Sequence, residues 1–358
     1  MKENDFIYES NQLIDGKVKW IAPSNIALVK YWGKKSVQLP ENPSISFTLS
    51  DCVTETEVIY FTKKRKKEFV DFDYSFDGNP KKEFDSKIEL FFKRINKYVP
   101  WVRNFYFQIK SKNSFPHSSG IASSASFMAS LSLCLMDIEK SLFPKMKLDY
   151  FNNKASFLSR LGSGSASRSI KGPICIWGSS PLLKNSNDYY AIEFGRSIHD
   201  IFKSYRDTIL IIDDKKKKIS SSMGHELMKN HPFSNQRIIQ SNKNLDSLMN
   251  ILKTGDLEGF IKIVELEALS LHALMMTSNP SYILIKPETL YVINKIIDFR
   301  EITKTPICFT LDAGPNLHLL YPENFSSKVL DFINSELINH CKNGKFILDK
   351  VGEGAKKI

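Results

Sequence analysis

The segment NSFPHSSGIASSASFMASL, residues 113–131, leads from an expected strand into an expected helix. From Ser118 to Ser124, six of seven residues are Ser, Gly or Ala, so the side chains at the start of the helix are small. Helix N-termini present unpaired N–H groups and a partial positive charge, and small side chains let an anion approach the backbone. The segment therefore predicts a phosphate-binding loop in which Ser123 and Ser124 cap the helix or offer hydroxyl groups. A well-capped helix packed closely on a sheet is the alternative.

The 358 residues are 42% hydrophobic and 25% charged, which is typical of a water-soluble globular chain with room for two lobes. No apolar stretch approaches the roughly 18 to 20 residues that span a bilayer, and the N-terminus lacks the apolar segment of a signal peptide. The cysteines are odd in number, far apart and without a CxxC pair, which favours reduced thiols and a cytoplasmic protein. They are Cys52, Cys134, Cys175, Cys308 and Cys341.

The chain has 50 Lys and Arg residues against 39 Asp and Glu residues, which gives a net charge of +11. Such a charge suits polyanionic ligands, and a non-catalytic protein that binds nucleic acid or an anionic membrane is the alternative from a different class. The basic runs at 63–67 and 215–218 lie between strand-like segments, which is typical of solvated hairpin tips. No RNP, helix-turn-helix or zinc-finger pattern accompanies them, so we expect no nucleic-acid or membrane partner.

The order of the expected elements predicts a mixed α+β fold, because strands are grouped early and helices come later. A long helical stretch at 244–276 is divided by Gly255 and Asp256, which predicts two helices rather than one. The length of the chain favours two lobes, and we expect these domains to span 1–197 and 198–358.

Three further segments carry residues that suit the chemistry of a site. Arg168 lies among Gly and Ser residues, where a guanidinium group suits a carboxylate or phosphate; an exposed Arg in a loop is the alternative. Lys30 lies in an otherwise apolar strand, where it needs a charged partner unless it points to solvent. Asp312 ends a strand before a Gly-Pro turn, which fits either a site acid or ordinary turn chemistry. The histidines have no metal-binding spacing.

Together, these segments resemble the diphosphomevalonate decarboxylases of the GHMP kinase superfamily. The matching stretches are spread over most of the chain. The combination of KYWGK, RLGSGSASRS and FTLDAGPN is specific within the superfamily. The stretches are APSNIA (22–27), KYWGK (30–34), LPENPSISFTLS (39–50), NSFPHSSGIASSAS (113–126), RLGSGSASRS (160–169), ISSSMG (219–224), FTLDAGPN (309–316) and VGEGA (351–355).

The resemblance implies a two-lobed α+β GHMP kinase fold. Its N-terminal lobe would be like ribosomal protein S5 domain 2, its C-terminal lobe ferredoxin-like, with a cleft between them. The implied activity is ATP-dependent decarboxylation of (R)-mevalonate 5-diphosphate to isopentenyl diphosphate, in the mevalonate pathway of isoprenoid biosynthesis, with ATP and Mg²⁺. The 3-hydroxyl group is phosphorylated first, and the phosphate then leaves as the C1 carboxylate departs as CO₂. Family members are often homodimers.

The same resemblance implies roles for individual residues. Asp312 would orient or deprotonate the 3-hydroxyl group, Lys30 would neutralise charge beside it, and Arg168 would hold an anionic end of the substrate. Ser124 would lie near the γ-phosphate and Mg²⁺. The implied substrate-binding residues are Tyr31, Trp32, Gly33, Lys34, Ser163, Gly164, Ser165, Ala166, Ser167, Arg168 and Ser222. The implied ATP-binding residues are Pro116, Ser118, Ser119, Gly120, Ile121, Ala122, Ser123 and Ser124.

The chain departs from the family pattern at His117-Ser118, where a Thr-Ala-Ala-like sequence is more usual, and at Ser167, where the family has Cys. Asp71 aligns near an Arg that the family often supplies to the diphosphate. A decarboxylase of mevalonate 5-phosphate is therefore one alternative. A mevalonate 3-kinase-like enzyme is another, which the presence of both the implied catalytic lysine and aspartate disfavours.

Overall fold

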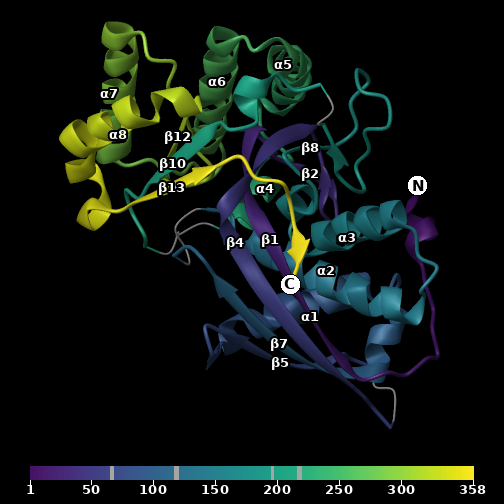
Figure 1. Cartoon of the computed structure of the whole chain (residues 1–358). Helices are drawn as coiled ribbons and strands as arrows, with labels where there is room; N and C mark the ends of the chain where they lie inside the picture. Colours follow the sequence, from purple (N-terminus) through teal and green to yellow (C-terminus); the bar gives the residue numbers. More distant parts are fainter. Residues whose placement is uncertain (65–67, 117–120, 195–196, 216–219) are drawn as a thin grey trace.

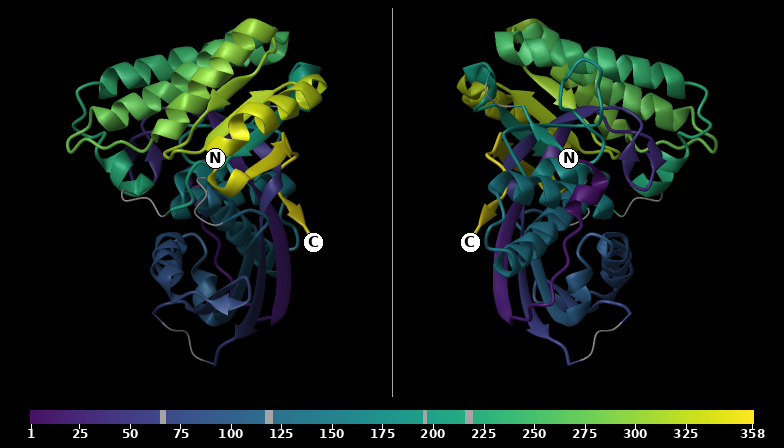
Figure 2. Two further views of the ribbon diagram at one scale, coloured as in Figure 1. Left: turned by 90° about the vertical axis from the view of Figure 1, so that its left-hand side faces the viewer. Right: turned by 90° about the vertical axis from the view of Figure 1, so that its right-hand side faces the viewer.

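A computed structural model describes residues 1–64, 68–116, 121–194, 197–215 and 220–358. Within these residues, strands form an N-terminal sheet, a smaller C-terminal sheet and a short hairpin, and helices cover both sheets (Figure 1). Figure 2 shows the long C-terminal helices stacked at one end of the molecule and the N-terminal sheet with its own helices at the other. The mixed α+β prediction is therefore confirmed.

The N-terminal sheet has the strand order β14-β1-β4-β7-β5-β6, and β8 pairs with β4 and with β9. Its strands are β1 (Gly16–Val29), β4 (Ser44–Thr62), β5 (Asp71–Phe76), β6 (Asn79–Pro80), β7 (Phe105–Asn113), β8 (Ile174–Trp177), β9 (Ile192–Glu193) and β14 (Lys356–Lys357). The hairpin β2 (Lys34–Ser36) and β3 (Leu39–Pro40) lies between β1 and β4 in the chain. The helices of this part are α1 (Asp85–Ile95), α2 (Ser123–Leu142) and α3 (Leu148–Gly162), followed by the 3-10 helix η4 (Gly164–Ser169).

The C-terminal sheet is antiparallel, with the order β11-β12-β10-β13. Its strands are β10 (Arg206–Leu210), β11 (Cys308–Thr310), β12 (Leu317–Tyr321) and β13 (Phe346–Lys350). The helices of this part are α4 (Ser221–Glu226), α5 (Ser234–Thr254), α6 (Leu257–Met276), α7 (Pro287–Thr303) and α8 (Ser326–Phe332). The predicted division of the long helical stretch is confirmed, since Gly255 ends α5 and the Asp256 side chain caps α6 by accepting from the Gly259 N–H.

Helix α2 lies against β1 and β4, and small hydroxyl side chains form part of its contact with the sheet. The Oγ atom of Ser126 is 2.6 Å from Thr54 Oγ1, and the Oγ atom of Ser130, one turn later, is 2.5 Å from Thr56 Oγ1. Thr54 and Thr56 lie two residues apart on β4, so their side chains point to the same face of the sheet. The serine-rich sequence thus lets a helix approach a sheet closely while the hydroxyl groups satisfy one another.

The predicted start of α2 at Ser123 is confirmed, but the predicted capping role of Ser123 and Ser124 is wrong. The N-cap is Ala122, which has a left-handed backbone with a φ of 42° and no side-chain acceptor that could cap the helix. Ser123 and Ser124 are the first and second residues of the helix, one and two positions too late to accept a capping hydrogen bond. Among the described residues, no side chain accepts a hydrogen bond from the N–H groups of this turn.

Strands β1 and β4 run through both ends of the molecule. Val18 and Ala22 of β1 belong to the core under α1–α3, whereas Ile26 and Leu28 pack with residues of α5 and α6 such as Leu248. The C-terminal strand β14 then pairs with β1. The division at 197/198 stays a prediction.

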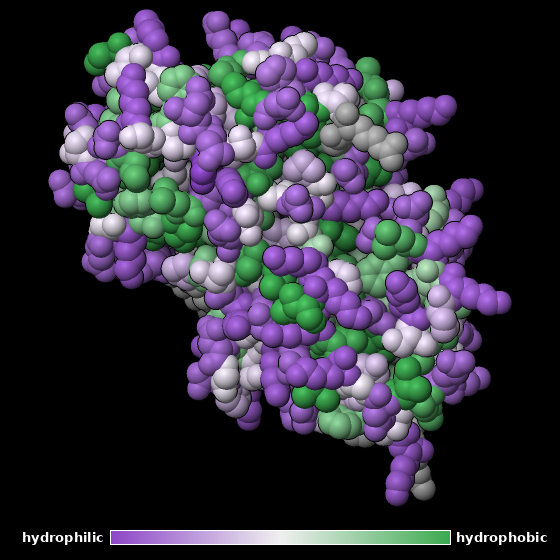
Figure 3. All heavy atoms as spheres, in the orientation of Figure 1, coloured by the Kyte–Doolittle hydropathy of each residue, from purple (hydrophilic) through white to green (hydrophobic). Residues whose placement is uncertain are grey.

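The face in Figure 3 is mostly hydrophilic, with smaller hydrophobic areas between the charged side chains. All five cysteines are buried and none forms a disulfide, as the sequence predicts. Among the described residues, no helix has the length and apolar character needed to cross a bilayer.

The N-terminal core contains a buried ion pair between Lys154 of α3 and Glu139 of α2, both fully inaccessible to solvent. Lys154 Nζ is 2.7 Å from each carboxylate oxygen and also donates to the Tyr98 carbonyl group, and Glu139 accepts from Trp101 Nε1 at 2.9 Å. Each charge is therefore balanced and hydrogen-bonded.

We predict that Lys154→Met lowers the free energy of unfolding by about 3–5 kcal/mol, because it leaves the Glu139 carboxylate buried without a cation. The double variant K154M/E139Q removes both charges and keeps an acceptor for Trp101, so it should recover most of that loss. Urea unfolding of the three proteins measures this. A single variant as stable as the double one would contradict the expected cost of the unpaired charge.

Candidate active site

The centre of the site is an ion pair between two segments 282 residues apart in the chain. Lys30 follows the last residue of β1, and its Nζ atom lies 3.1 Å from Oδ1 of Asp312, in the turn between β11 and β12. The Lys30 side chain is 2% exposed and that of Asp312 is 29% exposed. The carboxylate therefore lies between a buried ammonium group and the exterior.

Burial lowers the pKa of Lys30, and the nearby Asp312 carboxylate opposes this effect through its charge and its hydrogen bond. The Asp312 backbone is held in turn, because its carbonyl oxygen is 3.1 Å from His272 Nε2 of α6 and 2.6 Å from the Gly314 nitrogen. The carboxylate thus has a fixed position at the end of β11.

Arg168, in η4, is a second buried cation, 2% exposed. Its guanidinium group donates to Ser44 Oγ at 2.6 Å, to Ser46 Oγ at 3.1 Å and to Asn25 Oδ1 at 3.3 Å. These partners are neutral, and no carboxylate of the described residues forms a salt bridge with Arg168. Burial lowers its pKa to about 10, an effect that Asp312 opposes, so the group is protonated at neutral pH.

The sequence indicated Arg168 but not the hydroxyl groups that orient it. Ser44 and Ser46 lie two residues apart on β4, so both side chains point to one face of that strand. Only the pairing of β4 with β1 and β8 brings that face to Asn25 and to η4. The sequence did contain a signal for these two serines, because they are polar residues at alternate positions of an otherwise apolar strand.

The loop that carries Arg168 packs closely on Tyr31. A Cβ atom at Gly164 would lie 2.8 Å from the Tyr31 ring and 2.9 Å from Trp177, so a larger residue has no room there. The Tyr31 hydroxyl group is buried and has no hydrogen-bond partner within the described residues. Burial raises its pKa, which keeps the phenol protonated and able to donate.

The other residues of this loop have different positions. Ser165 is half-buried, and its carbonyl oxygen accepts from Asn25 Nδ2. Ala166 and Ser167 are fully buried, and the Ser167 hydroxyl group donates to the Gly164 carbonyl oxygen at 2.9 Å, so it stabilises the turn. Ser163 ends α3, and its Oγ atom is 3.5 Å from Oγ of Ser124.

Trp32 and Gly33 contact helix α4. The Gly33 N–H donates to His225 Nδ1 at 3.0 Å, and the His225 ring lies against Tyr31 and Trp32, with ring centroids 4.3 and 4.6 Å away. Gly33 has a φ of +99°, which favours glycine. Ser222 is exposed on α4. His225 is buried, as expected of a core histidine, but the sequence did not connect it with Tyr31 and Trp32.

Lys34 lies near a guanidinium group that the sequence did not single out, Arg94 of α1. Arg94 Nη1 donates to the Leu161 carbonyl oxygen at 2.8 Å, two residues before Ser163. Burial lowers the pKa of Lys34 to about 8, with the charge of Arg94 acting in the same direction and Glu226 opposing it. Asp71, by contrast, forms an ion pair with Lys63 at 3.1 Å.

The expected ATP-binding segment is described in part. Ser118, Ser119 and Gly120 lie outside the described residues, as does His117. The residues on either side are Pro116, which is exposed, and Ile121, which is buried.

The described part of the expected ATP-binding segment is held to β1 and leads into α2. Ser24 Oγ donates to the Ile121 carbonyl oxygen at 2.7 Å. Ala122 and Ser123 are half-buried and Ser124 is exposed at the start of α2.

Within the described residues, no group of three or more His, Cys, Asp or Glu side chains could hold a metal ion. Mg²⁺ commonly keeps water ligands and binds one or two protein groups together with substrate phosphates. The exposed Ser124 hydroxyl group, with Ser163 beside it, fits a Mg²⁺ ion held mainly by a nucleotide.

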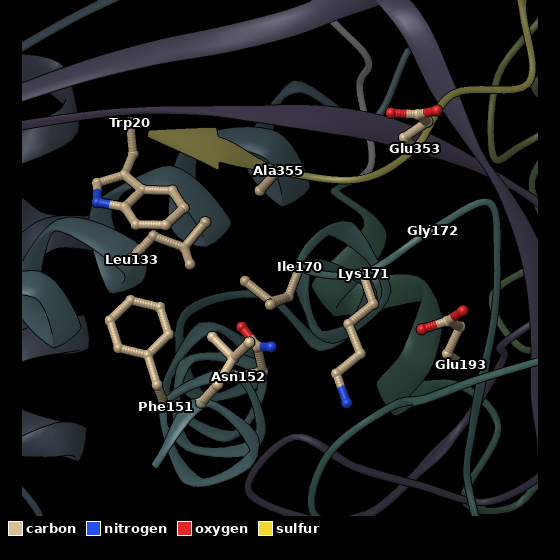
Figure 4. A pocket seen from close by; sticks show the side chains of 11 residues that line it. Trp20, Leu133, Phe151, Asn152, Ile170, Lys171, Gly172, Glu193, Glu353 and Ala355 are labelled. Carbon is tan, nitrogen blue, oxygen red and sulfur yellow. The ribbon is translucent and has the colours of Figure 1, made fainter. Parts of the chain in front are cut away.

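A separate cavity of about 310 Å³ lies at the edge of the N-terminal sheet (Figure 4). Trp20, Phe151 and Ile170 form its apolar walls, and Lys171 and Glu193 also line it. None of its lining residues is an expected site residue.

Comparison with known families matches nearly the whole chain. Residues 22–188 match the model of the diphosphomevalonate decarboxylase-like N-terminal domain, and residues 208–356 match that of the mevalonate 5-diphosphate decarboxylase C-terminal domain. A curated relative, diphosphomevalonate decarboxylase of Debaryomyces hansenii, is 29% identical over 324 residues, which cover 87% of this chain and 81% of the relative.

Solved structures share the fold. Mevalonate diphosphate decarboxylase from Staphylococcus aureus has a TM-score of 0.81 and 27% identity, and the match covers 96% of this chain and 98% of that one. A complex of MDDEF with MVAPP, AMPPCP and magnesium has a TM-score of 0.81 and 24% identity, and covers 96% of this chain and 99% of that one.

We predict that Lys34 titrates near pH 8 and that Arg94→Gln raises its pKa, because the variant removes a nearby positive charge. Glu226→Gln should lower it, since Glu226 acts in the opposite direction. An NMR titration of isotopically labelled lysine, with Lys34→Arg to assign the signal, measures these shifts. A Lys34 pKa that does not respond to either variant would show that the three groups are not electrostatically coupled.

Proposed function

The chain belongs to the diphosphomevalonate decarboxylase family, and we propose that it converts (R)-mevalonate 5-diphosphate and ATP into isopentenyl diphosphate, CO₂, ADP and phosphate. The observation that carries the proposal is the Lys30–Asp312 ion pair beside the buried Arg168, which has neutral partners. Two buried cations and one carboxylate leave an excess of positive charge, which suits a polyanionic substrate.

In the first step, the oxygen of the 3-hydroxyl group bonds to the γ-phosphorus atom of ATP, the bond to the bridging oxygen breaks, and ADP leaves. The Asp312 carboxylate accepts a hydrogen bond from the hydroxyl group and takes up its proton. Lys30, 3.1 Å away, holds that carboxylate in place and balances the negative charge around the transferring group. Positioning and charge supply most of the catalysis in such transfers.

In the second step, the bond between C3 and the phosphate oxygen breaks and inorganic phosphate leaves with the electron pair. The electrons of the bond between C1 and C2 form the double bond between C2 and C3, and C1 departs as CO₂. Asp312 returns its proton to an oxygen of the departing phosphate, and the carboxylate restored in this way stabilises the positive charge that develops at C3. Arg168 binds an anionic group of the substrate, which fixes the geometry of the departing groups.

ATP binds with its phosphates at the start of α2, where the first-turn N–H groups have no side-chain cap among the described residues. The hydroxyl groups of Ser124, at the start of α2, and Ser163, before η4, are close enough to bind the same ligand. Mg²⁺, when bound with ATP, neutralises the phosphate charge and favours transfer of the phosphoryl group. The MDDEF complex holds magnesium together with MVAPP and AMPPCP, which supports the same cofactor here.

Lys34 and Arg94 bind the terminal phosphate of the 5-diphosphate. The two cations are coupled, and the described carboxylates form no salt bridge with either of them. Arg94 reaches the loop from α1, so it replaces the Arg that the family pattern places near Asp71. This pair favours the 5-diphosphate over the 5-monophosphate.

We also propose a homodimer, from the family resemblance, and expect sedimentation to give twice the mass of the chain. The five buried cysteines, free of disulfides, support a cytoplasmic location.

The direct test is a parallel assay of ADP and CO₂ release with the 5-diphosphate. We expect both products in equal amounts, and Asp312→Asn should lower kcat about 100- to 10,000-fold with little change in the KM for ATP. Asp331→Asn, at an exposed position of α8, is the matched control. ADP release without CO₂ would indicate a 3-kinase, and an Asp312 variant with normal turnover would remove Asp312 from the mechanism.

The substrate preference tests the Lys34–Arg94 pair. Arg94→Gln should raise the KM for the 5-diphosphate about 10-fold and leave that for the 5-monophosphate nearly unchanged, because one charged hydrogen bond to the terminal phosphate is lost. Lys93→Gln, exposed on the same helix, is the control. Equal effects on both substrates would place Arg94 away from the terminal phosphate.

A further inference from the structure

Lys30 lies just beyond the end of β1. Its backbone N–H and carbonyl groups bind side chains, where residues within β1 bind the backbone of a neighbouring strand. The last paired residue of β1 against β4 is Val29. The Lys30 N–H donates to Oε2 of Glu267 at 2.8 Å. The Lys30 carbonyl oxygen accepts from Nη2 of Arg237 at 2.8 Å and from Nδ2 of Asn42 at 2.9 Å. Two of these three partners come from the C-terminal helices α5 and α6.

Arg237 and Glu267 also bind each other. Their fork-to-fork contact has Nη1–Oε1 at 2.8 Å and Nη2–Oε2 at 2.6 Å, and both residues are buried, 3% and 0% exposed. Asn244 Nδ2 donates to Oε1 of Glu267 at 2.6 Å. The two side chains are therefore fixed by a planar, bidentate arrangement that lysine cannot reproduce. We call this pair the Arg237–Glu267 clamp.

We propose that the Arg237–Glu267 clamp positions Lys30 for the reaction, by holding its main chain at both the N–H and the carbonyl group so that Nζ reaches Asp312. The proposal rests on the proposed function, in which Lys30 and Asp312 act at the reacting hydroxyl group. Arg237 and Glu267 do not touch the substrate in this proposal; they act through Lys30.

The geometry favours positioning over a purely structural role. A lysine side chain is long and has several rotatable bonds, so the place of its ammonium group depends on where its main chain is held. Asp312 lies in the turn between β11 and β12 of the C-terminal sheet, and the clamp also comes from the C-terminal helices. Lys30 is thus bound at its backbone and at Nζ by the same half of the molecule. A misplacement of about 1 Å in such a group costs about 100-fold in rate.

Charge works in the same direction. The Glu267 carboxylate opposes the effect of burial on the Lys30 pKa, as Asp312 does, whereas the positive charge of Arg168 reinforces it. Burial of an ion pair by itself adds little net stability, since desolvation offsets the attraction between the charges. The contacts with Lys30 therefore account for the clamp better than stability does.

The test compares two buried ion pairs in the full-length enzyme. R237M/E267Q removes the charges of the clamp together. K154M/E139Q does the same to the pair between α2 and α3, whose hydrogen bonds go to Tyr98 and Trp101, neither of which is a site residue. We expect R237M/E267Q to lower kcat about 100-fold with the KM for ATP changed less than about 3-fold. K154M/E139Q should keep kcat within about 2-fold of the wild type, as a change outside the site does.

The variant Arg237→Lys distinguishes an effect on the position of Lys30 from an effect on the stability of the protein. It keeps a cation for Glu267 but not the planar fork that also binds the Lys30 carbonyl oxygen, so the midpoint of urea unfolding should stay near that of the wild type while kcat stays low. This variant carries the test if R237M/E267Q does not fold.

A normal kcat in Arg237→Lys, or in a folded R237M/E267Q, overturns the inference. Equal losses of kcat in R237M/E267Q and K154M/E139Q also overturn it, because the effect would then follow stability. A wild-type enzyme that releases neither ADP nor CO₂ contradicts the proposed function, and the inference with it. An active wild type with active clamp variants contradicts the inference alone.

Discussion

The burial of the Lys30 ammonium group is the constraint on which the site depends. A lysine with a 2% exposed side chain needs an anion close by, and Asp312 supplies one from a turn at the far end of the chain. The end of β1 must therefore meet the turn after β11, which fixes how the two sheets approach each other. Arg168 lies nearby, but its partners are hydroxyl and amide groups, so Asp312 is the anion that faces both cations.

The small residues before and within α2 serve two purposes that the sequence alone presents as alternatives. Ser126 and Ser130 pair with threonines of β4, which is the close packing of a helix on a sheet. Ser123 and Ser124 lie in the first turn, whose N–H groups have no side-chain cap among the described residues. One run of small side chains thus brings the helix close to the sheet at one position and keeps the start of the helix free of bulky groups at another.

Local features were predictable from the sequence, and contacts between distant segments were not. The start of α2 and the break at Gly255 follow from residues within a few positions of each other. The capping prediction failed because it depended on one residue of register, and Ala122 takes a left-handed conformation that the sequence does not indicate. The family resemblance led to Lys30 and Asp312 as partners, since no local pattern connects residues 282 apart.

The residues that sequence reasoning missed share a cause. Ser44 and Ser46 reach Arg168 through the pairing of strands, and the charge of Arg94 acts on Lys34 of β2 from helix α1. Two partners of the Lys30 backbone lie on α5 and α6. Each depends on tertiary register, which the periodicity of a single segment does not contain. His225 is of the same kind, because only the packing of α4 brings it to Tyr31.

The length of β1 and β4 has a consequence for how the molecule unfolds. One half of β1 belongs to the core under α1–α3, and the other half packs with α5 and α6; Phe47 of β4 stacks on Phe260 with ring centroids 6.0 Å apart. Neither lobe can lose its core without removing strands from the other. The two halves of the chain are therefore coupled into a single cooperative melting unit, even though their sheets are separate.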